Sequence, residues 1–151
     1  MAIGIPAETV LTGTAVYVIG QLVSKLFVEP LNEWRVALGE VASTLLYWAN
    51  VYSNPAVRTG PEGDPARNKA CEEIRRLAGL IRVKSRAVPG YRVLAIVGLA
   101  PLQKDVEEAA KQLTFLSNSL YMQPNEQGNR PLENIASSNK VSVLLKLGLI
   151  I

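Results

Sequence analysis

The longest apolar run of the chain lies near its start. Residues 9–28 read TVLTGTAVYVIGQLVSKLFV and carry no charge before Lys25. A helix of about 20 residues is about 30 Å long, which matches the hydrocarbon core of a bilayer. Pro6 and Glu8 suit the start of this helix, and Pro30 is expected to end it. The pattern predicts a transmembrane helix within residues 1–30.

Two other interpretations of this run stay open. A core helix of a soluble protein would accommodate Gln21, Ser24 and Lys25 easily. A cleavable signal peptide normally begins with a basic segment, whereas the residues before the run carry only the terminal amine and Glu8. We favour the span, because Lys25 lies close enough to its end for the ammonium to reach the interface.

The rest of the chain, residues 31–151, shows helical periodicity and little strand-like alternation. Helices are expected over residues 32–52, 64–88, 101–121 and 131–148, with a buried or interfacial helical turn over 91–100. Trp34 follows the run closely and is expected at the membrane interface. We therefore predict an all-α protein, with a transmembrane helix followed by a cytoplasmic bundle of about four helices.

Composition narrows the location and the chemistry. The chain has one cysteine, Cys71, and no histidine. A lone cysteine suits a reducing compartment, and the basic residues after the run place the domain in the cytoplasm and the N-terminus outside. Missing histidine excludes Cys/His zinc sites and Ser-His-Asp or Cys-His catalysis. We expect a non-enzymatic protein with no metal and no cofactor, and the sequence identifies no small-molecule substrate.

Small and polar residues form a stripe along the apolar run. Thr9, Gly13, Gly20 and Ser24 share one helix face, and Gln21 adjoins it. Small residues let helices approach closely in lipid, so the stripe predicts self-association into a homo-oligomer. A pore lined by threonine and glutamine is the most specific form of this prediction. The alternative is that glycine is simply frequent in membrane spans.

The most basic segment is residues 67–92, with eight cations against Glu72 and Glu73. A basic helix face suits anionic lipid headgroups, nucleic-acid phosphates or an acidic partner. Nucleic acid is possible but not favoured, because only Tyr91 is available nearby for base stacking. The alternative is a solvated face paired with Glu107 and Glu108. The candidate contacts to lipid or polyanion are Lys25, Arg75, Arg76, Arg82, Lys84, Arg86 and Arg92.

Four polar residues interrupt apolar helical segments: Arg35, Glu40, Asn50 and Asn118. Asn50 and Asn118 are expected to be buried, where amides require hydrogen-bond partners. One interpretation is that these residues fix helix register. The other is that they line a ligand pocket.

Three stretches carry a resemblance: LGEVASTLLYWANVYSNP, IRRLAGLIRVKSRAVPGYRVLAIVGLAP and EEAAKQLTFLSNSLY. They resemble a group of short bacterial proteins of unknown function with one N-terminal span and a small helical domain. This resemblance implies the architecture and a bacterial inner-membrane location, but it supplies no activity and no functional residues for this chain. In outline the chain is also similar to membrane-anchored HEPN-like effectors of phage defence. Their nuclease motif needs a histidine, so RNA cleavage by that route is excluded.

Overall fold

The computed structural model describes residues 7–54, 65–120 and 130–148, and every regular element in these ranges is a helix. The expected all-α class is therefore confirmed for these residues. Residue 64, the expected start of the helix over residues 64–88, lies outside them. The elements are α1 (Ala7–Val23), the π-helix η1 (Ser24–Val28), α2 (Glu29–Tyr47), α3 (Ala49–Ser53), α4 (Pro65–Ala87), α5 (Tyr91–Ile96), α6 (Gln103–Ser119) and α7 (Arg130–Leu145).

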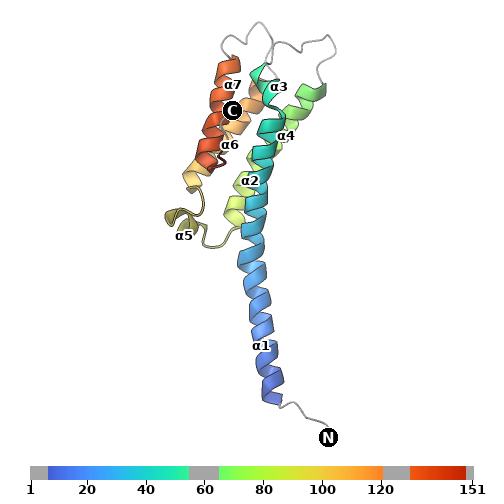
Figure 1. Cartoon of the computed structure of the whole chain (residues 1–151), viewed down its shortest axis with the longest axis vertical. Helices are drawn as coiled ribbons and strands as arrows, with labels where there is room; N and C mark the ends of the chain where they lie inside the picture. The colour runs from blue at the N-terminus through green and yellow to red at the C-terminus, as the bar shows by residue number, and fades with distance from the viewer. Residues whose placement is uncertain (1–6, 55–64, 121–129, 149–151) are drawn as a thin grey trace.

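A single long shaft runs through α1, η1 and α2 (Figure 1). Helices α4, α3 and α7 contact α2, α6 packs on α4 and α7, and α1 projects beyond the bundle alone. The expectation that Pro30 ends the first helix is wrong, because Pro30 is the second residue of α2. The expected boundary between residues 1–30 and 31–151 therefore falls inside a continuous helix.

The π-helix explains how the shaft accommodates Pro30. In an α-helix, the proline ring clashes with the carbonyl four residues earlier, which here belongs to Leu26. Immediately before the proline, the Glu29 N–H donates to the Ser24 carbonyl, a bond that spans five residues instead of four. This wider turn relaxes the α-helical geometry at the point where the ring needs room. The helix therefore continues past Pro30 without breaking.

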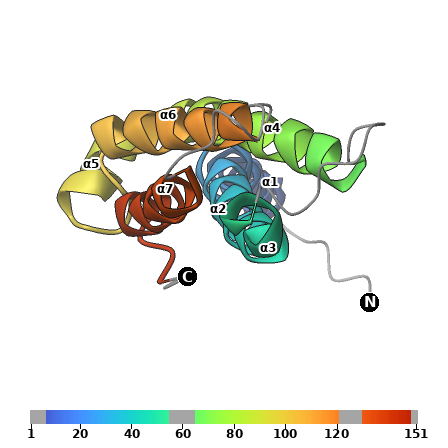
Figure 2. The same ribbon diagram turned by 90° about the horizontal axis from the view of Figure 1, so that it is seen from above.

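The helices of the bundle form two layers around one core. Seen from above, α4 and α6 lie in one layer and α2 and α7 in the other (Figure 2). Helix α6 contacts both α4 and α7, and α2 contacts α4. The predicted apolar faces of α4 and α6 are confirmed as core. They contribute the buried residues Ala70, Ile74, Leu77, Ala78, Ile81, Val106, Ala109, Ala110, Leu113 and Leu116.

The two tryptophans both pack inside the bundle. Trp34 is only 2% exposed, so the expectation that its side chain contacts the membrane interface is wrong. It faces α5, and its ring meets that of Tyr91 edge-on at 5.7 Å between centroids. Trp48 separates α2 from α3, and its indole N–H donates to Glu73 of α4 at 2.6 Å. The expected continuous helix to Tyr52 is therefore interrupted at Trp48.

Helix α5 returns the chain from α4 to α6. As expected from Pro89 and Gly90, α4 stops here, with Gly90 in the left-handed conformation at φ 67°. Tyr91 and Ala100 are buried at the two ends of this connection. Between them α5 stands out from the bundle, at the end from which α1 leaves (Figure 1).

Candidate membrane interface

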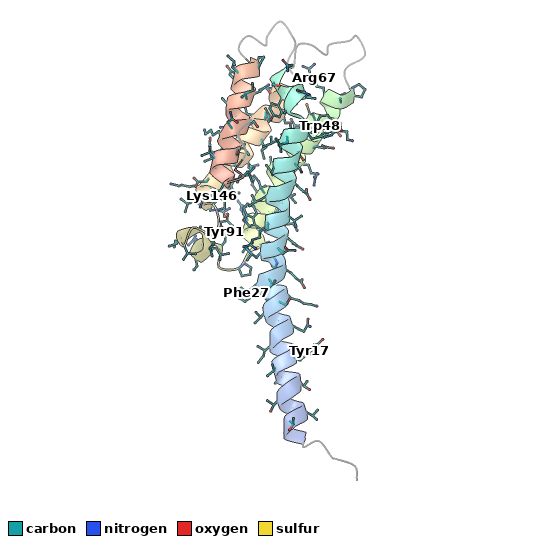
Figure 3. All side chains as sticks on the ribbon, viewed as in Figure 1. Tyr17, Phe27, Trp48, Arg67, Tyr91 and Lys146 are labelled. Carbon is teal, nitrogen blue, oxygen red and sulfur yellow. The ribbon has the colours of Figure 1, made fainter. Side chains whose placement is uncertain are left out.

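Helix α1 presents apolar side chains that no described part of the chain covers. From residue 9 to residue 28 every side chain is exposed except that of Ser24, which is partly buried. Figure 3 shows Tyr17 and Phe27 projecting from the bare shaft. Helix Thr9–Tyr47 is long and apolar enough to cross a membrane, and none of its most apolar window is buried. So large an apolar surface is unfavourable in water and marks a contact with lipid or protein.

The small-residue face, formed by Thr9, Gly13 and Gly20 of α1 and Ser24 at the start of η1 with Gln21 beside it, belongs to this uncovered surface except for the partly buried Ser24. A Cβ atom added at Gly13 or Gly20 would meet no heavy atom within 4 Å. The two glycines are therefore not needed for packing within one copy of the chain. Their role in self-association remains a prediction.

The basic face of α4 makes ion pairs within the chain. Arg82 and Arg86 donate to the two oxygens of Glu107 at 3.0 and 2.9 Å. Arg76 pairs with Glu40 at 3.1 Å, and Lys84 pairs with Glu33 at 2.7 Å. Arg75 donates to the side chain of Asn118. These contacts match the solvated, paired interpretation of the helix and leave less charge for an external polyanion.

Glu107 is the centre of the pairing between α4 and α6. Partial burial raises the pKa of this carboxyl, but hydrogen bonds and charge from Arg82 and Arg86 outweigh burial and lower the pKa below its usual value. The carboxylate is thus held in its charged form. This arrangement ties the end of α4 to the first half of α6, directly above α5.

Two cations expected to meet lipid or a polyanion, Lys25 and Arg92, lie at or near the α5 end of the bundle, together with Arg35, which was expected only as a polar residue within an apolar helical segment. Lys25, Arg35 and Arg92 are exposed, and none has an ion pair within the described residues. Arg92 is part of α5, while Lys25 and Arg35 flank the start of α2. Contact with lipid or a polyanion remains a prediction for Lys25 and Arg92.

The polar residues expected to be buried are on the surface. Asn50 lies on the exposed side of α3, after the break at Trp48, and Asn118 is exposed and bound to Arg75. Burial of Asn50 and Asn118 is therefore a wrong expectation, because neither amide faces the core. Glu40 is partly buried and pairs with Arg76 across α2 and α4.

A cluster of buried polar side chains joins α3 to α7. The sequence did not predict this cluster. The Tyr52 hydroxyl donates to the Leu45 carbonyl at 3.0 Å and lies 3.0 Å from the Ser138 hydroxyl. The amide of Asn134 donates to the Tyr52 carbonyl at 2.8 Å. Burial raises the pKa of Tyr52, and the hydrogen bond with Ser138 offsets only part of this increase. The sequence did not reveal that these residues are buried, because polar residues are usually expected at the surface and the apolar runs around them drew attention instead.

Cys71 is a buried packing residue. Its thiol donates to the Ser117 carbonyl at 3.4 Å, and the Ser117 hydroxyl donates to the Cys71 carbonyl at 2.9 Å. This reciprocal pair joins α4 to α6. A thiol enclosed in this way is not accessible to a substrate.

The α5 tip is an exposed apolar surface on α5 and the turn that follows it. Its members are Val93, Ile96, Val97 and Leu99. The sequence predicts a buried or interfacial turn here, and the structure buries only its two ends.

A comparison of the chain with protein-family models, curated proteins and solved structures finds no match.

Proposed function

We propose that this protein is a non-enzymatic membrane protein anchored by α1, with a cytoplasmic bundle of about four helices, and that it self-associates through α1. The observation that carries the proposal is the uncovered apolar surface of α1. A bundle with its own complete core does not need this helix for folding. A helix of about 20 apolar residues beside such a bundle is best accommodated in lipid, which covers its apolar side chains.

The direction of the anchor follows from charge. Lys25, Arg35 and Arg92 lie toward the bundle end of the span, and basic residues flank spans on the cytoplasmic side. The buried Cys71 suits the same compartment. We therefore place the bundle in the cytoplasm of a bacterial cell and the N-terminus outside.

Self-association is supported by the small-residue face of α1. Association of helices in lipid depends on close backbone approach and polar contacts, because lipid provides no hydrophobic drive between helices. Gly13 and Gly20 permit that approach, and Gln21 offers a polar contact beside them. The strongest form of the proposal is an oligomer that encloses a pore.

Anchoring is tested by extraction of membranes with alkaline carbonate. We expect the full chain to stay in the membrane pellet, because α1 crosses the bilayer. Recovery of a monomer in the soluble fraction would contradict both anchoring and self-association.

Self-association is tested by Gly20→Leu, with Ala15→Leu on the opposite face of α1 as the matched control. Open space around Gly20 means that the substitution leaves a single copy undisturbed. We expect Gly20→Leu to weaken association at least about tenfold, or about 1.4 kcal/mol, and Ala15→Leu to leave it unchanged. Particle mass in detergent and in lipid nanodiscs measures both; an unchanged mass for Gly20→Leu contradicts the proposed face.

The alternative function, a membrane-tethered binding module for nucleic acid or an acidic protein partner, has less support. It requires the cations of α4 to be available, whereas Arg82, Arg86 and Lys84 already contact carboxylates. Binding of this kind would weaken steeply with salt. A salt-sensitive complex that is lost on Arg75→Ala with Arg86→Ala would favour this alternative.

A further inference from the structure

The α5 tip is an apolar surface with no cover. Val93, Ile96, Val97 and Leu99 are 62%, 81%, 61% and 72% exposed. Scattered exposed apolar residues are ordinary on proteins, but a contiguous group marks a contact surface. Val93, Ile96 and Val97 are spaced so that they share one helix face, and Leu99 follows in the same short segment.

The fold sets the height of this tip relative to the anchor. Tyr91 at the start of α5 packs edge-on against Trp34 of α2. Trp34 lies about 9 Å beyond Val28 along the shaft, at about 1.5 Å per residue. The headgroup layer on one side of a bilayer is about 5–8 Å thick. With Val28 at the edge of the hydrocarbon core, α5 therefore sits at the membrane surface, as its place at the α1 end of the bundle also indicates (Figure 1).

An open apolar groove lies between α5 and the start of α6. Its volume is about 350 Å³, and its lining is mainly apolar. The lining residues are Tyr91, Arg92, Ala95, Ile96, Leu102, Gln103 and Lys104. The groove thus has an apolar floor and two basic residues, Arg92 and Lys104, in its lining, which suits an acidic lipid.

The two cations are available. Arg92 and Lys104 are exposed and make no ion pair within the described residues. Of the neighbouring carboxylates, Asp105 follows Lys104 directly, while Glu107 already binds Arg82 and Arg86. Lys146 adds a further positive charge, since its ammonium donates to the Gly98 carbonyl at 3.2 Å beside the tip.

We propose that the α5–α6 groove binds an anionic phospholipid of the membrane, with an acyl chain in the groove and the phosphate between Arg92 and Lys104. The α5 tip is then a second membrane contact, which fixes the bundle against the bilayer. This inference rests on the proposed anchoring by α1, which brings the groove to the lipid. Acyl chains contribute through burial of methylene groups, and nearby cations contribute through the phosphate.

The depth of the α5 tip tests this proposal in the full chain. Val97→Cys carries a nitroxide, and Leu46→Cys, an exposed apolar position at the far end of α2, is the matched control. Cys71 is 1% exposed and stays unlabelled. In vesicles of phosphatidylcholine and phosphatidylglycerol, we expect Val97 to be accessible to oxygen and protected from a water-soluble nickel chelate. Leu46 should show the reverse.

A third label separates this proposal from the proposed anchoring. Val16→Cys lies in the middle of the apolar run and reports whether α1 enters the bilayer. If Val16 reports lipid and Val97 reports water, the groove proposal is overturned and the anchor stands. If Val16 also reports water, the anchor fails. If Val97 is shielded from both reagents, a protein covers the tip, which overturns the lipid site.

Substitution of the two cations tests recognition of the phosphate. We expect Arg92→Ala with Lys104→Ala to reduce the preference for phosphatidylglycerol over phosphatidylcholine among retained lipids by roughly tenfold. The matched control is Lys69→Ala with Lys111→Ala, which removes two exposed cations elsewhere. Native mass spectrometry of the full chain measures the retained lipid. Equal preference in both double variants would overturn the assignment of Arg92 and Lys104.

Discussion

The side chain of Tyr91, at the α1 end of the bundle, has a strongly raised pKa. Its ring packs on Trp34, but its buried hydroxyl has no hydrogen-bond partner among the described residues. Burial, with a smaller contribution from the charge of Asp105, raises the pKa of Tyr91 to about 12. The hydroxyl is therefore a destabilising feature inside a stabilising aromatic contact.

We predict that Tyr91→Phe raises the free energy of unfolding by about 1 kcal/mol, because it removes an unsatisfied buried hydroxyl and keeps the ring. Since the pKa of Tyr91 is higher in the folded state than the ordinary 10.0, the parent protein loses stability as pH rises from about 10 toward about 12. The variant lacks this loss. Chemical unfolding followed by tryptophan fluorescence at pH 8 and pH 11 measures both effects.

Tyr47→Phe is the control for this prediction, because Tyr47 is 74% exposed and should change neither quantity. A loss of stability in Tyr91→Phe at pH 8 would mean that the hydroxyl has a partner in the folded protein.

At the scale of elements, the sequence predicts the helices by periodicity but not their continuity. The spacing of Ile74, Leu77 and Ile81 suffices for α4, since one face of a helix must be apolar to pack. The continuation through Pro30 was not predictable from the same rule, because a π-turn depends on the geometry of the whole shaft. Proline alone argues for a break.

The candidate membrane interface was predictable only in part. The apolar run of α1 is a strong local signal, whereas the positions of Trp34 and Asn118 depend on which helices face them. Trp34 is buried because α5 folds back onto α2, and Asn118 is exposed because α4 offers it Arg75 at the surface. Contacts between distant segments of this kind leave no periodic pattern in the sequence.

We predict that Pro30→Ala converts η1 into ordinary α-helix. The substitution restores an N–H and removes a ring clash, and proline in a helix interior is unfavourable by about 3 kcal/mol. The turn already relieves part of this penalty. Amide hydrogen exchange over residues 24–32 should therefore slow by about tenfold, or about 1.4 kcal/mol.

Pro65→Ala is the matched control, because Pro65 is the first residue of α4, where a proline displaces no hydrogen bond. Exchange in α4 should change little. If the π-helical hydrogen bond from Glu29 to Ser24 persists in Pro30→Ala, the proline is not its cause.

At the scale of the whole molecule, the proposed orientation has a direct test. Tyr47→Cys should react with a membrane-impermeant maleimide in inside-out vesicles and not in right-side-out vesicles. Ala2→Cys should show the opposite pattern, because the proposed orientation places the bundle in the cytoplasm and the N-terminus outside. The parent chain serves as the blank, since Cys71 is buried. A reversed pattern would contradict the cytoplasmic placement.

The π-helix also sets the rotation of the bundle about the helix axis relative to α1. Each residue of an α-helix advances the chain by about 100°, and a π-turn adds a residue to one turn. Removing one residue from η1 would swing the entire bundle by about 100° about the shaft, with core and anchor intact. In an assembly whose central axis lies along the small-residue face of α1, that angle decides whether the α5–α6 grooves point toward the axis or toward surrounding lipid. One residue of this turn thus decides in which direction each bundle of such an assembly faces.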